Sequence, residues 1–133
     1  MIGERINAKA YNLKLKATIQ QTGKMGFNAD AIEQLQISEN KAVFLAPDTQ
    51  EKNVLYMAVV EAEGNDTAFA VRKSGAYFYI NTKQLFDQME FNYAKQTIIF
   101  DLSRCAKYDE AIGGECYKMT SRIKPRTVDE NNE

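Results

Sequence analysis

Alternating apolar and polar residues predict short strands in the first half of the chain. Over residues 13–20 the odd positions are apolar and the even positions are polar, which is the period-two pattern of a half-buried strand. A Thr-Gly-Lys turn at 22–24 separates this strand from an extended stretch at 25–27. Asn28 is a residue type that caps helices, and the apolar stripe behind it predicts a short helix that ends near Leu35. Two further strands are predicted at 41–45 and 54–60.

The same order of elements recurs after a polar connection at 61–67. A strand at 68–73, a Ser-Gly turn and a strand at 77–80 precede Asn81 or Thr82, either of which can cap a second helix. The last strands are predicted at 97–102 and 116–119. When the two halves are placed side by side, Gly23 corresponds to Gly75, and Asn28 corresponds to Asn81.

This correspondence predicts a β-turn-β-α-β unit that occurs twice, over about 13–61 and 68–120, in one compact domain of residues 13–120. One hairpin with one helix cannot cover its own apolar face, and a second copy covers it by closing a barrel without free strand edges. The expected fold class is therefore β-rich α+β, a barrel of two units with pseudo-two-fold symmetry and two short helices. Coincidence of hydrophobic periodicity is the alternative. The flanking parts are an N-terminal segment, 1–12, and a flexible C-terminal tail, 121–133, in which Arg122, Lys124 and Arg126 precede acidic residues.

Composition narrows the classes of function. The chain has 133 residues, which suits one domain, and a net charge of -1 with a pI of about 5.6. No general basic field therefore attracts nucleic acid or membrane, so a local patch would be required. The first eleven residues lack the apolar core of a signal peptide, and no apolar run approaches the ~20 residues of a membrane helix. We expect a cytoplasmic protein that does not enter a membrane.

The reactive residues argue against catalysis. The chain has no histidine, so Ser-His and Cys-His activation are excluded, and two cysteines alone cannot complete a four-ligand zinc site. Neither a dinucleotide fingerprint nor a phosphate-binding loop occurs. We expect no catalytic residue, no metal and no cofactor, and thus no enzyme. Cys105 and Cys116 could face each other across a hairpin, within reach of a disulfide, although reduced thiols are the favoured state.

Residues 19–37, together with the strands at 42–45 and 54–60, carry a resemblance to a known family. They resemble the AbrB/MazE/SpoVT-type swapped-hairpin domain, with a strand, a glycine-cation turn, a short strand, a capped helix ending in Leu-x-Ile, and two strands. The resemblance covers about 13–61 and, more faintly, 68–120. It implies a barrel of two interlocked hairpins that binds duplex DNA as a transcriptional regulator or antitoxin. Lys24 matches the family's turn arginine.

The chain also departs from the family's pattern. Asn28 stands where the family usually has proline, and Ala76 leaves the second turn without its cation. The expected partner is nevertheless duplex DNA, and the candidate contacts are the cations of the strands, turns and second helix, namely Lys14, Lys16, Lys24, Arg72, Lys73 and Lys83. Tyr77 and Tyr79 could stack on unpaired bases, which leaves single-stranded nucleic acid open.

The same cations and aromatic residues also have purely structural explanations, and these lead to an alternative function. Lysines on outward strand faces keep a sheet soluble, and neighbouring aromatic residues often pack across strands. The alternative is a non-enzymatic protein-interaction or assembly module without nucleic acid, acting as a homo-oligomer or with a protein partner. The mild acidity favours this alternative, whereas the turn lysine and the family resemblance favour nucleic-acid binding.

Overall fold

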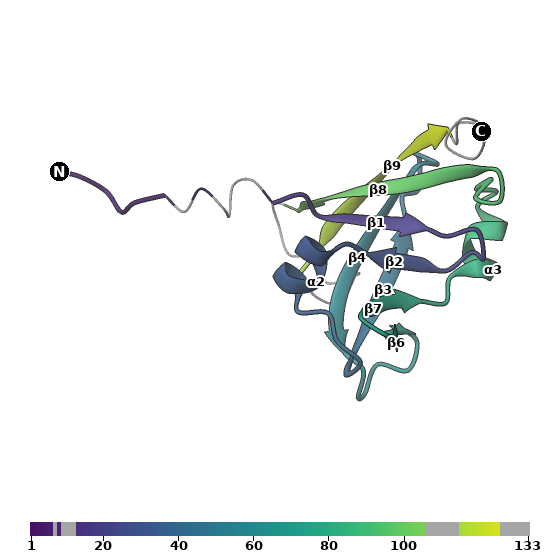
Figure 1. Ribbon diagram of the computed structural model, residues 1–133, viewed down its shortest axis with the longest axis horizontal. Coiled ribbons are helices and arrows are strands. Elements are labelled where there is room, and N and C mark those ends of the chain that lie inside the picture. The colour runs from purple at the N-terminus through teal and green to yellow at the C-terminus, as the bar shows by residue number, and fades with distance from the viewer. Residues whose placement is uncertain (7, 9–12, 106–114, 126–133) are drawn as a thin grey trace.

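The computed structural model describes residues 1–6, 8, 13–105 and 115–125, and these residues form one antiparallel sheet with two short helices (Figure 1). The strands are β1 (Lys16–Ile19), β2 (Met25–Phe27), β3 (Lys41–Pro47), β4 (Val54–Glu61), β5 (Phe69–Ala70), β6 (Arg72–Ser74), β7 (Tyr77–Ile80), β8 (Gln96–Arg104) and β9 (Tyr117–Pro125). The helices are α2 (Ala29–Leu35) and α3 (Lys83–Gln88).

The nine strands curl into a nearly closed barrel. Their hydrogen-bonding order is β5-β3-β4-β9-β8-β1-β2-β7-β6. The two outermost members, β5 and β6, follow each other in the chain with only Val71 between them. One extended segment therefore pairs with β3 through its first part and with β7 through its second part. This segment joins the two ends of the sheet.

Strand pairing also ties the two halves of the sequence together. The hairpins β1–β2, β3–β4, β6–β7 and β8–β9 are each formed by consecutive strands. Between the halves, β2 pairs with β7 so that Gly26 lies opposite Tyr79, and β4 pairs with β9 so that Leu55 lies opposite Met119. Neither half completes the sheet without the other.

The interior is filled by the inward side chains of the strands and by aromatic rings near α3. Phe86 of α3 is fully buried and lies 5.8 Å from the ring of Phe100, and Phe91 packs edge-on against both rings. Fully buried aliphatic and methionine side chains from both halves complete the core, namely Ile19, Met25, Leu55, Met57, Ile80, Ile98 and Met119. In Figure 1, α2 and α3 lie toward opposite ends of the barrel.

Both helices end with the same backbone geometry. Gln36 and Glu90 have left-handed φ values of 55° and 64°, a conformation that non-glycine residues rarely adopt. In each case the next residue closes the helix, because Ile37 N donates to Ile32 O at 3.0 Å and Phe91 N donates to Phe86 O at 3.1 Å.

The two helices begin differently. The Asn28 side chain caps α2 by accepting a hydrogen bond from Ala31 N at 2.9 Å, as expected from the sequence. Thr82, rather than Asn81, occupies the capping position of α3. Its buried hydroxyl does not cap the helix but donates to Gly23 O, 2.9 Å away in the β1–β2 turn. This bond anchors the start of α3 to the other half of the chain.

The β-rich α+β class predicted from the sequence is confirmed. β1 begins at Lys16 rather than at residue 13, and the strand predicted at 68–73 is divided at Val71 into β5 and β6. The sheet takes in residues 121–125 of the segment that the sequence sets apart as a tail, because these residues pair with β8. The turn of the hairpin predicted between Cys105 and Cys116 falls within 106–114, and this segment and the remainder of the tail, 126–133, lie outside the described residues. No helix in the described part has the length and apolar content that crossing a membrane requires.

Candidate nucleic-acid interface

One side of the sheet carries most of the strand-borne cations. Successive side chains of a strand point to opposite faces, and the buried positions identify the inward set. On β9, β1 and β6 the outward positions include the cations Lys118, Arg122, Lys124, Lys16 and Arg72. Lys14 and Lys24 continue this alternation just before β1 and β2. We call these seven residues the basic face.

The register relates the strands of the basic face to one another. Arg72 lies opposite Tyr79, Tyr79 lies opposite Gly26, and these positions belong to the neighbouring strands β6, β7 and β2. Further along the sheet, Ile99 of β8 lies opposite Arg122. Asp101 is the single acidic residue among the described outward positions of these six strands, and it pairs with Arg122 at 2.7 Å. Cations therefore outnumber acidic residues at the outward positions of the six strands β9, β8, β1, β2, β7 and β6.

The structure separates the six cations predicted from the sequence. Lys14, Lys16, Lys24 and Arg72 belong to the basic face. Lys73 lies on the opposite side of β6, opposite Phe78, whose ring its ammonium approaches to 5.7 Å. It does not join the basic face because neighbouring strand residues point to opposite sides.

Lys83 is placed on α3 instead of a strand. Its ammonium pairs with Asp87 one helical turn away at 2.7 Å. The hydrogen bond to Asp87 raises the pKa of Lys83, and the same hydrogen bond lowers the pKa of Asp87. Lys83 is therefore already partly neutralised by its own helix.

Tyr77 and Tyr79 lie together on the outward side of β7. Their rings are 6.0 Å apart and nearly parallel, and the ammonium of Lys24 lies 4.7 Å from the Tyr79 centroid. The Tyr77 hydroxyl accepts a hydrogen bond from the amide of Gln20 on the other hairpin. The two predicted aromatic contacts thus sit beside a cation of the basic face.

Gly26 makes room for this aromatic pair. A Cβ atom at Gly26 would lie 1.5 Å from the Tyr77 hydroxyl oxygen and 2.2 Å from its Cζ, so the ring crosses β2 directly over the glycine. The resulting loss of solvent raises the pKa of Tyr77, and the hydrogen bond from Gln20 opposes this effect. The ring is consequently held in one position as a neutral phenol.

Most cations of the basic face make no close ion pair. In the part of the chain that the structure describes, Arg122 is the one member that pairs with a carboxylate, although its partner Asp101 also lies opposite Lys16 in the β1–β8 ladder. Most of the acidic residues that the structure describes are found instead in the helices and connecting loops, among them Asp30, Glu33, Glu39, Asp48, Glu51, Glu63, Asp66, Asp87 and Glu90. Acidic residues are therefore scarce on the basic face, although the chain has a net charge of -1.

Sequence reasoning missed the three cations of β9. Lys118, Arg122 and Lys124 alternate with other residues at period two, together with Thr120, and this alternation is the signal that could have identified a strand. The inward partners in this part of β9 are not uniformly apolar, since Ser121 is among them. The apolar half of the strand pattern is therefore too weak to distinguish the strand from a polar tail.

The outward side of β3 and β4 is apolar rather than basic. Ala58 and Cys116 are buried there among partly buried apolar residues, namely Phe44, Ala46, Tyr56, Val60 and Cys105. We call these seven residues the apolar outer cluster. It adjoins the basic face where Tyr56 lies opposite Lys118.

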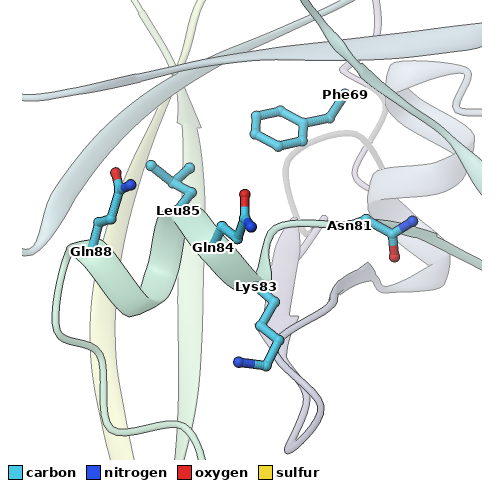
Figure 2. A pocket seen from close by; sticks show the side chains of 6 residues that line it. All are labelled: Phe69, Asn81, Lys83, Gln84, Leu85 and Gln88. Atoms are coloured by element: carbon cyan, nitrogen blue, oxygen red, sulfur yellow. The ribbon is translucent and has the colours of Figure 1, made fainter.

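A cavity of about 430 Å³ lies between β5 and α3 (Figure 2). Phe69 lines it from the strand side, and Leu85 and Gln84 extend toward Phe69 from the helix, whereas the Lys83 ammonium points away from that ring. No group of three or more acidic or cysteine side chains that could hold a metal ion occurs within residues 1–6, 8, 13–105 and 115–125.

Comparisons with known proteins add no relative. Neither protein-family models, nor curated proteins, nor solved structures give a significant match to this chain.

Proposed function

We propose that this protein binds nucleic acid through the basic face, with duplex DNA as the principal ligand. The observation that carries the proposal is the scarcity of acidic residues on the basic face of an overall slightly acidic chain. The described outward positions on and just before the strands β9, β8, β1, β2, β7 and β6 hold seven cations and one acidic residue, Asp101, and phosphate binding requires such an excess of positive charge. A solubilising role also places lysine and arginine outward, but it does not require acidic residues to be scarce there.

The chemistry of binding follows from the residue types. Lysine and arginine side chains neutralise phosphates and release the condensed counterions of the nucleic acid, so affinity falls as salt increases. Thr18, Thr97 and Thr120 lie between the cations at outward positions, and their hydroxyls can donate to phosphate oxygens. Tyr77 and Tyr79 provide an aromatic area beside Lys24, where an unpaired base would stack.

We further propose that the barrel consists of two copies of one β-β-α-β-β unit, arranged as interlocked hairpins within a single chain. Two equivalent pairings between the halves support it, since β2 pairs with β7 and β4 pairs with β9. The turns of the first hairpins both use a glycine with positive φ, 89° at Gly23 and 63° at Gly75. Identical helix ends at Gln36 and Glu90 give a third correspondence.

The proposed arrangement agrees with the swapped-hairpin resemblance and with the role it implies in transcription regulation or as an antitoxin. Lys24, which matches the family's turn cation, belongs to the basic face. Ala76 leaves the second turn without such a cation, and Arg72 supplies one from the adjoining strand instead. The two halves would then contribute unequally to one binding surface.

Two neighbouring residues provide a sharp test. Arg72→Gln removes a cation from the basic face, whereas Lys73→Gln removes an equal charge from the other side of the same strand. Fluorescence titration with duplex and single-stranded oligonucleotides at two salt concentrations should show weaker binding for Arg72→Gln alone. The slope of log affinity against log salt should fall by roughly one unit for that variant. Equal effects of both substitutions, or binding that does not respond to salt, would contradict phosphate contact through this face.

The apolar outer cluster favours one second candidate, a protein-interaction module. It presents Phe44 and Tyr56 beside buried Ala58 on the outward side of a sheet, where a monomer usually places polar residues. The same titration separates the two functions. Absence of binding to either oligonucleotide at low salt would contradict the first proposal and leave this cluster as the candidate binding surface.

A further inference from the structure

The structure brings the two cysteines of the chain together. Cys105 directly follows β8, and Cys116 directly precedes β9. The backbone N–H of Cys105 donates to the carbonyl of Cys116 at 2.9 Å. They continue the β8–β9 register, in which Arg104 lies opposite Tyr117. Neither residue is in a disulfide in the structure, and Cys105 is half-buried whereas Cys116 is 4% exposed. Both belong to the apolar outer cluster and so lie on the same side of the sheet.

This geometry permits a disulfide, but not a relaxed one. Directly opposed residues that share a backbone hydrogen bond in an antiparallel ladder have α carbons about 5.5 Å apart, which lies within the range for disulfides. Their β carbons lie about 4.5–5.5 Å apart, whereas a disulfide prefers about 3.8 Å. The strands must therefore draw together when the bond forms. A bond under such strain is reduced more easily than a structural disulfide.

We propose that Cys105 and Cys116 form a reversible disulfide by exchange with a low-molecular-weight disulfide such as oxidised glutathione. The more exposed Cys105 thiolate attacks one glutathione sulfur, and the other glutathione leaves as a thiolate that takes up a proton. The Cys116 thiolate then attacks the sulfur of Cys105 and releases the second glutathione. Two protein thiols are oxidised, one glutathione disulfide is reduced to two thiols, and the protons of the protein thiols pass to the leaving groups.

The consequence concerns the connection between the last two strands. The ion pair between Arg104 and Glu115 and the hydrogen bond from the Tyr117 hydroxyl to Glu115 lie beside the two cysteines. A disulfide would add a covalent link across the same point and close the connection between β8 and β9 into a loop. It would also replace two thiols of the apolar outer cluster by one bridged pair next to Ala58 and Tyr56.

The wild-type protein itself tests the proposal. The full chain is incubated under native conditions with oxidised glutathione, and its intact mass is followed by mass spectrometry. We expect a transient adduct of one glutathione, followed by a monomer that has lost two hydrogens and both free thiols. Dithiothreitol should restore the original mass. Thiols that stay free, a stable adduct of two glutathiones, or chains linked to each other would each overturn the proposal.

Two variants test the order of the steps. In Cys116→Ala the adduct on Cys105 should persist, because the second thiol that resolves it is missing. In Cys105→Ser the remaining thiol should react about tenfold more slowly than Cys105 does in Cys116→Ala, because Cys116 is 4% exposed. Rapid reaction of both single variants at equal rates would contradict the assignment of Cys105 as the attacking group.

Discussion

Gly26→Ala tests how closely the two hairpins are fitted at the centre of the basic face. Gly26 does not have positive φ, so alanine is compatible with its backbone conformation. The added methyl group would nevertheless lie 1.5 Å from the Tyr77 hydroxyl oxygen and 2.7 Å from its Cε1. The tyrosine ring must therefore leave its place over β2, and its hydrogen bond with Gln20 is lost.

The expected cost has two parts. Overpacking at a tightly filled site costs about 1–3 kcal/mol, and loss of the hydrogen bond costs about 1 kcal/mol. Because the ring can move partly outward, we expect a total near 2 kcal/mol in the free energy of unfolding. For a domain of this size that corresponds to a fall in Tm of roughly 6–8 °C. Urea denaturation followed by circular dichroism would measure the change, with an unaltered m-value showing that the native state stays compact.

A double-mutant cycle with Tyr77→Ala isolates the proposed cause. In the Tyr77→Ala background the methyl group meets open space, so Gly26→Ala should cost less than about 0.5 kcal/mol or even stabilise through reduced chain entropy. Tyr77→Phe is the matched control, because it keeps the ring and removes only the hydroxyl. Equal costs of Gly26→Ala in the wild-type and Tyr77→Ala backgrounds would refute the packing argument.

Three further predictions concern helix ends and a loop carboxylate. Asn28→Ala should lower the free energy of unfolding by about 1–2 kcal/mol in urea titration, because the Asn28 side chain accepts from Ala31 N and Lys16 N; a change below about 0.3 kcal/mol would contradict that role. Gln36→Gly and Glu90→Gly should each raise the free energy of unfolding by up to about 1 kcal/mol, and with it the Tm, because glycine adopts left-handed φ without strain. A lowered Tm for both variants would contradict the geometry of the helix ends. The backbone N–H groups of Glu51 and Gln50, followed by the Tyr56 hydroxyl, hold the pKa of Asp48 below its ordinary value of 3.8. A carboxylate with a lowered pKa stabilises the fold above its unfolded pKa, and this stabilisation is lost as pH falls through the folded value. Asp48→Asn should therefore lose less stability than the wild-type protein below about pH 4 in acid titration. An acid profile identical to that of the wild type would contradict these hydrogen bonds.

Much of the sheet could be predicted from local pattern. The alternation before and after Gly23 indicates β1 and β2, and the continuous apolar run at 54–60 indicates β4, because these strands bury one or both faces. The bend at Val71 could not be predicted in this way. It arises because one segment must pair with β3 on one side and with β7 on the other, which is a property of the closed sheet and not of the local residues.

The site was predictable only in part, for a related reason. Arg72 and Lys73 are adjacent cations, and the sequence offers no means of deciding which one points outward until the register of β6 against β7 is known. Arg122 and Lys124 were missed because residues 121–125 resemble a polar tail, whereas Lys118 lies in the strand predicted at 116–119 and was not assigned to the site. Thr82 was recognised as a capping residue, yet its hydroxyl binds Gly23, 59 positions earlier in the chain, and no local pattern reveals such a contact.

The segment from β5 to β6 has a consequence for how the barrel opens. Both junctions at the ends of the sheet depend on residues 69–74, and the three residues of β6 are exposed. Release of this short stretch would free the edges of β3 and β7 in a single step, turning a nearly closed barrel into an open sheet with two unpaired strands. Amide hydrogens along these edges should therefore exchange together, and earlier than those of β8 and β9. Unpaired edges are where foreign strands add, so self-association on mild destabilisation should begin at β3 and β7.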